Sequence, residues 1–103
     1  MNEILLKKKL MERKCELFKI IDECGNRLEN APAGSLRVNE KSNRVDYYHY
    51  DSEDATKPPH GRYIRRNNLE LAKALAQKDY DEKVKEIAET ELFHVNELLK
   101  KYN

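Results

Sequence analysis

The chain has 103 residues, of which 38% are charged and 39% are hydrophobic, and its formal net charge is +1. This length predicts a single domain over residues 1–103, and the near-neutral charge excludes an overall field that would draw the chain to DNA or to a membrane. With two phenylalanines and no tryptophan, the core is expected to be thin, so a partner or a second copy would help to cover apolar surface.

Residues 1–29 are predicted to form one long helix. Apolar side chains recur there at three-, four- and seven-residue steps, which is the spacing of one helix face. This stripe contains Leu6, Leu10, Leu17, Ile21, Cys24 and Leu28, and it is widened by Ile4, Met11 and Phe18. Gly25 either costs roughly 1 kcal/mol inside this helix or ends it early. Residues 30–34 contain Pro32 and Gly34 and predict a firm stop.

The two cysteines, Cys15 and Cys24, are nine positions apart on the predicted helix. At 100° per residue they lie on opposite faces, about 13 Å apart along the axis, which excludes a disulfide between them within one chain. The apolar run at the start is too short for a signal sequence, and no stretch is long enough to span a membrane. The chain is therefore expected to be cytoplasmic and reduced.

Residues 34–66 are predicted to form a three-stranded antiparallel β-meander. Leu36 and Val38 alternate with polar residues, which is a period of two. A polar break at 41–43 is typical of a hairpin turn, and Asn43 tolerates a positive φ. Residues 45–50 are rich in β-favouring aromatics, and residues 61–65 give a short third strand. Because tyrosines occupy both parities of the second strand, its buried face stays open.

Residues 67–103 are predicted to form a second long helix, capped by Asn67 or Asn68. No glycine or proline interrupts this segment. The simplest arrangement packs the two helices antiparallel, with the meander at one end. The fold class is thus predicted to be α+β, in the order α-β-β-β-α.

The meander brings together arginines and tyrosines that are candidates for a binding surface. Arginine and tyrosine bind phosphates and stack on bases, and they also anchor protein interfaces. The candidate residues are Arg37, Arg44, Tyr48, Tyr50, Arg62, Tyr63, Arg65 and Arg66. The competing interpretation is that the tyrosines form a core and the arginines form a solvated sheet face.

Metal and catalytic sites have weaker signals. No C-x-x-C or H-x-x-x-H spacing occurs. A loop could bring together His49, His60, Asp51 and Asp54, but isolated surface histidines are the preferred interpretation. The serines lie in no nucleophile motif, and Asp79, Asp81 and Glu82 are expected to form a solvated helix face. We therefore expect no enzyme activity and no cofactor.

Four segments resemble an uncharacterised family of Firmicutes and phage proteins. These are Ala31-Pro32-Ala33-Gly34-Ser35-Leu36-Arg37, Tyr47-Tyr48-His49, Tyr63-Ile64 and Leu71-Ala72-Lys73-Ala74-Leu75-Ala76-Gln77-Lys78-Asp79-Tyr80-Asp81-Glu82-Lys83-Val84. In that family the similar segment precedes a region resembling restriction endonucleases. The present sequence stops before such a region, so nuclease activity is not carried over. The resemblance implies an accessory module, and a small phage protein of this kind would fit an inhibitor of host defence, such as an anti-CRISPR protein.

Two functions follow as expectations. The first is a non-enzymatic binding module that engages and inhibits a host nuclease or defence effector, as a protein or nucleoprotein target. The second is a DNA-binding accessory module that uses the arginines of the meander. For this second function, the strand–strand–strand–helix order of the chain is similar, at the level of fold alone, to the three-stranded DNA-binding module of tyrosine recombinases.

Overall fold

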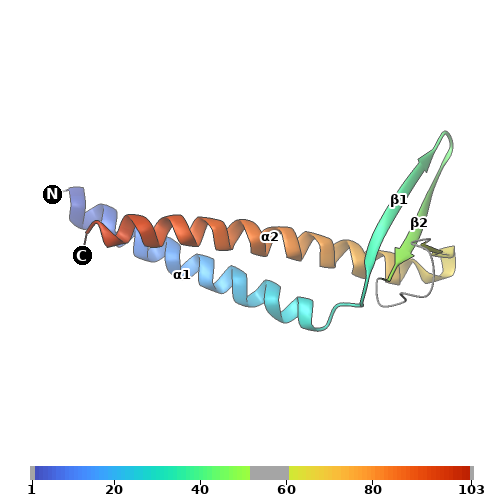
Figure 1. Cartoon of the computed structure of the whole chain (residues 1–103), viewed down its shortest axis with the longest axis horizontal. Helices are drawn as coiled ribbons and strands as arrows, with labels where there is room; N and C mark the ends of the chain where they lie inside the picture. Colours follow the sequence, from blue (N-terminus) through green and yellow to red (C-terminus); the bar gives the residue numbers. More distant parts are fainter. Residues whose placement is uncertain (1, 52–60, 103) are drawn as a thin grey trace. The chain divides into compact units, whose positions relative to one another are not determined.

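The computed structural model describes residues 2–51 and 61–102 (Figure 1). In chain order the elements are helix α1 (Asn2–Glu29), strands β1 (Ser35–Lys41), β2 (Arg44–Tyr50) and β3 (Arg62–Tyr63), a 3-10 turn η1 (Arg66–Asn68) and helix α2 (Leu69–Lys100). The predicted α+β order is therefore confirmed. Helix α1 runs through Gly25 to the predicted end, and α2 begins directly after the Asn67-Asn68 pair.

The chain divides into two compact units. The helical unit joins α1, up to Leu28, to the part of α2 from Asp81 onward, and the sheet unit comprises Glu29–Tyr80. Each unit has a hydrophobic cluster of its own. Helix α2 takes part in both, since its residues up to Tyr80 belong to the sheet unit.

The helical unit is built around Leu17, which is 1% exposed. Leu17 packs in one cluster with Ala88, Val95 and Leu99 of α2, and full burial of a leucine side chain contributes about 1.5–3 kcal/mol. The stripe predicted for α1 is only partly covered. The residues that widen this stripe, Ile4, Met11 and Phe18, are exposed, because a single partner helix covers only one side of α1.

Two ion pairs fix the antiparallel register of the helices. Arg13 Nη2 donates to Glu91 Oε1 at 2.9 Å, and Arg27 Nη2 donates to Asp81 Oδ1 at 3.0 Å. These hydrogen bonds raise the pKa of each arginine further above its ordinary value, and the bond from Arg13 lowers the pKa of Glu91.

Asp81 corrects one expectation. It was expected to lie on a solvated helix face, but its side chain is 2% exposed and pairs with Arg27. The Arg27 Nε also lies 3.1 Å from both carboxylate oxygens. A buried carboxylate requires such partners because desolvation is costly for a charge. The other two carboxylates of that group, Asp79 and Glu82, are exposed as expected.

The sheet unit contains the predicted meander, in the order β1-β2-β3 with both pairs antiparallel. The hairpin turns at Ser42 and Asn43. Among the described residues only Gly34 has a positive φ, so the turn does not use the positive φ that Asn43 tolerates. Strand β3 is shorter than predicted, although the Ile64 N–H still donates to the Tyr47 carbonyl at 2.8 Å.

The core of the sheet unit is small and lies between the meander and the start of α2. Ile64, Ala72 and Leu75 are buried there, and Leu36 and Tyr47 pack against them. This contact settles which side of β2 faces the core, a point that the sequence left open.

Gly34 sets the entry into β1. Its φ is +94°, a conformation that glycine adopts at little cost. Its carbonyl accepts a hydrogen bond from Lys78 Nζ at 2.8 Å. A side chain at this position would run into the Tyr50 carbonyl and the His49 ring. The segment 30–34, where the helix was predicted to end, therefore contacts both the sheet and α2.

The cysteines match their prediction. Cys15 is exposed, Cys24 is buried and both are free thiols. Within residues 2–51 and 61–102, no helix combines the length and the apolarity that crossing a membrane requires.

Candidate functional site

The two faces of the sheet differ in what covers them. Residues paired across adjacent strands point to the same face, and the faces alternate along each strand. Leu36 is paired with His49, and Val38 with Tyr47, so these residues share the face that carries the core contacts of Leu36 and Tyr47. Residues of the other parity lie on the opposite face, away from that core.

The opposite face gathers one arginine and three tyrosines, which we call the aromatic face: Arg37, Tyr48, Tyr50 and Tyr63. Arg37 is paired with Tyr48, and Tyr48 with Tyr63. The rings of Tyr48 and Tyr63 meet edge to face, with centroids 5.8 Å apart. The guanidinium carbon of Arg37 lies 5.2 Å from the centroid of Tyr50, within the range of a cation–π interaction.

Gly61 supports the aromatic face from the edge of the sheet. A Cβ on Gly61 would lie 2.7 Å from the Tyr50 Cδ2 atom and 2.8 Å from the Tyr48 Cβ atom. The backbone at Gly61 therefore lies against both tyrosines. Tyr48 and Tyr50 are half-buried, whereas Tyr63 is 53% exposed.

A buried carboxylate lies further along the same face, toward the hairpin turn. Asp46 is 4% exposed, and one of its oxygens lies 3.4 Å from Lys41 Nζ and 3.4 Å from Arg44 Nε. Lys41 and Arg44 are themselves a cross-strand pair. Arg44, which was predicted to be a binding residue, is thus engaged in an ion pair within the hairpin.

The remaining predicted arginines lie elsewhere. Arg62 is paired with His49, on the core side of the sheet, and with Arg65 it lines a pocket of about 320 Å³. His49, Asn67 and Asn68 line the same pocket. Arg66 does not line it; it begins the 3-10 turn η1. The structure therefore brings together five of the eight predicted residues on one face, and of the other three, Arg62 and Arg65 line a pocket together with Tyr63 of that face.

The predicted metal set is described only in part. Asp54 and His60 lie outside the described residues. His49 Nε2 lies 2.7 Å from the Ala33 carbonyl oxygen, so that nitrogen donates a hydrogen bond there. Over residues 2–51 and 61–102, no group of three or more histidine, cysteine, aspartate or glutamate side chains is placed to hold a metal ion.

Sequence reasoning missed Asp46, Lys41 and Gly61 as parts of this face. Asp46 was not named among the candidate binding residues. Its parity with Tyr48 and Tyr50, two and four positions ahead, was the available signal, since residues at even spacing share a face. Gly61 carried no such signal, because its contact depends on how β3 lies against β2.

Comparison of the chain with protein-family models, with curated proteins and with solved structures yields no match in any of the three. The family resemblance of the segments from Ala31 onward thus stays a prediction.

Proposed function

We propose that this protein is a non-enzymatic binding module that recognises a protein target through the aromatic face. The observation that carries the proposal is the cluster of Arg37, Tyr48, Tyr50 and Tyr63 on the side of the sheet opposite its core. Tyrosine and arginine are enriched among the residues that dominate binding energy at protein interfaces.

The cluster is assembled before any partner arrives. Tyr48 and Tyr63 hold each other edge to face, and Arg37 is held over Tyr50. An immobilised side chain otherwise costs about 0.5–1.5 kcal/mol on association. Side chains that are already positioned avoid part of this cost, so a small surface gains affinity without added area.

The charges on this face favour a protein target over DNA. Non-specific DNA binding depends on cations that are available to neutralise phosphates. Here Lys41 and Arg44 are paired with the buried Asp46, and Arg37 is stacked on Tyr50. The whole chain carries a formal charge of only +1.

In its narrower form, the proposal is that the target is a host nuclease or another defence effector, which the protein inhibits in the host cytoplasm. This form is supported by the resemblance of residues 31–84 to an accessory module of phage and Firmicutes proteins. Its test is whether expression of the chain raises phage plating on cells with an active defence system, relative to the same cells without that system.

The experiment for the general proposal is capture from a bacterial lysate on immobilised protein. Wild type is compared with a variant that combines Tyr48→Ala and Tyr63→Ala. The control is Val45→Ala, since Val45 is also apolar and 46% exposed but lies on the other face of the sheet. We expect a protein retained by wild type and by the control and lost from the double variant. Circular dichroism verifies that all three are folded.

Two further arms separate the alternatives. If capture disappears after nuclease treatment and falls steeply between 50 and 200 mM salt, roughly the range over which binding through several phosphate contacts weakens by orders of magnitude, the target is DNA and the proposal is wrong. The variant combining Arg65→Glu and Arg66→Glu tests the arginines outside the aromatic face. Loss of binding in that variant alone would place recognition there instead.

A further inference from the structure

The helical unit leaves an apolar stripe of α1 without a covering element among the described residues. Ile4, Met11 and Phe18 are 81%, 52% and 52% exposed, and they follow one another at seven-residue spacing. Residues seven apart lie about 20° apart around a helix, so the three side chains form one line. Such a repeat is the seam of helix–helix packing.

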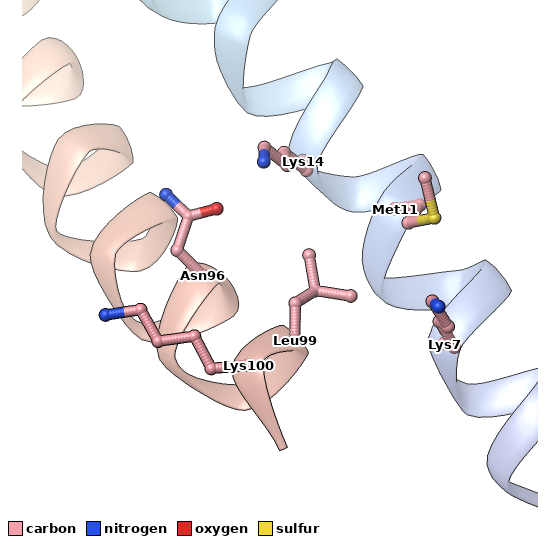
Figure 2. A pocket seen from close by; sticks show the side chains of 6 residues that line it. All are labelled: Lys7, Met11, Lys14, Asn96, Leu99 and Lys100. Carbon is pink, nitrogen blue, oxygen red and sulfur yellow. The ribbon is translucent and has the colours of Figure 1, made fainter. Parts of the chain in front are cut away.

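Met11 of this stripe lines a groove between α1 and α2 (Figure 2). Met11 and Leu99 supply its apolar lining, and its polar lining is Lys7, Lys14, Asn96 and Lys100. The groove has a volume of about 470 Å³. A second hollow along α1 shares Lys7 and Met11 with it and reaches Ile4 and Cys15. Through Met11, the hollow that contains Ile4 therefore adjoins the groove between the two helices.

Helix α2 presents a second apolar residue on the groove side. Phe93 is 60% exposed, and it lies seven residues before Lys100, which lines the groove. Glu89 lies seven residues before Asn96, another lining residue. By the same helical repeat, Phe93 and Glu89 lie on the groove side of α2.

The charges around the two helices have opposite sign. On α1, residues 4–19 contain six basic and two acidic side chains, whereas residues 82–97 of α2 contain five acidic and two basic ones. The basic residues of α1 thus have opposite charge to the acidic residues of α2 in the same chain. A second copy offers this complementary charge without any other partner.

We propose that the chain forms a symmetric homodimer in which two helical units pack groove to groove as a four-helix bundle. A two-fold axis parallel to the helices places α1 of one copy over α2 of the other, in antiparallel directions. This arrangement is isologous, so each contact occurs twice. Left-handed four-helix bundles, in which neighbouring helices are antiparallel, are a common packing arrangement for helical hairpins.

The ion pair between Arg13 and Glu91 sets the level of each residue along the bundle. By that register, Met11 is level with Phe93, and Lys14 is level with the turn that contains Glu89. Across the dimer, Met11 of one copy then meets Phe93 of the other, and Lys14 meets Glu89. The proposal uses the helical unit alone and is independent of binding by the aromatic face.

Sedimentation equilibrium tests the dimer at protein concentrations of tens of micromolar. Wild type is expected at twice the monomer mass of 12.2 kDa. The combination of Met11→Glu and Phe18→Glu is expected to be monomeric with unchanged helix content. The matched control is Ile87→Glu, at a residue 66% exposed and about 120° from Phe93 around α2, which is expected to stay dimeric.

A charge swap makes the test specific to this arrangement. Lys14→Glu alone and Glu89→Lys alone each create two like-charge contacts per dimer, and each is expected to raise the dissociation constant at least about tenfold. An equal mixture of the two variants restores opposite charges at both contacts and is expected to recover the wild-type constant. A monomeric wild type, a dimeric Met11/Phe18 variant, or a mixture without recovery would each overturn the proposal.

Discussion

In the helical unit, the buried carboxylate of Asp81 is held by Arg27, 54 residues away on the other helix. In the sheet unit, the buried carboxylate of Asp46 is held by Lys41 and Arg44, its neighbours on one hairpin. The first pair joins two distant segments and so belongs to the tertiary structure. The second organises a surface locally. The difference teaches that burial of a charge depends on a tertiary contact in the helical unit and on local pairing within one hairpin in the sheet unit.

The largest expected effect comes from the core of the helical unit. Leu17→Ala removes the central side chain of the cluster that also contains Ala88 and Val95. Such truncations cost about 2–5 kcal/mol of unfolding free energy, a large share for a chain of this size. Urea denaturation followed by circular dichroism measures the loss. A cost below about 1 kcal/mol would mean that the two helices do not depend on this contact.

Gly34→Ala is expected to have the next largest effect, in the sheet unit. The left-handed conformation costs an L-residue about 1–2 kcal/mol, and the added methyl group would also press on the Tyr50 carbonyl and the His49 ring. We expect a lower denaturation midpoint in urea. An unchanged midpoint would show that β1 can start from a different backbone conformation.

Gly25→Ala should act in the opposite direction. Gly25 lies inside α1, and a Cβ there meets no atom within 4 Å. Alanine should therefore stabilise the protein by about 0.5–1 kcal/mol through its higher helix propensity. The same urea titration measures the gain, and destabilisation would indicate that the helix is not continuous at this point.

The smallest expected effect is a dependence of stability on pH. Arg13 donates to Glu91 in the folded protein and lowers the pKa of that carboxyl below its ordinary value of about 4.5. A depressed pKa contributes stability that is present above pH 4.5 and is lost as the pH falls through the folded-state value. Glu91→Gln should lack this part of the dependence. Melting temperatures of both proteins between pH 3 and 7 measure it, and parallel curves would contradict the assignment.

The helices and their order were predictable because long apolar periodicities and the stop at residues 30–34 are local signals. The parity of β2 was not, since Tyr47 and Tyr48 have equal β-propensity and only packing against Ile64 distinguishes them. The burial of Asp81 was also beyond local reasoning, because it depends on Arg27 from another helix. For the candidate site, the sequence predicted which arginines and tyrosines belong to it. It did not predict which face of the sheet each strand residue lies on, because that depends on strand register.

The central claim is that the aromatic face contacts a protein, and photo-crosslinking tests it most directly. The photoreactive amino acid p-benzoylphenylalanine replaces Tyr48 in one variant and Val45 in another, because these residues lie on opposite faces of β2. Irradiation in a bacterial lysate is expected to give a protein adduct from position 48 and none from position 45. Adducts of equal yield from both positions, or an adduct with DNA at position 48, would contradict the account.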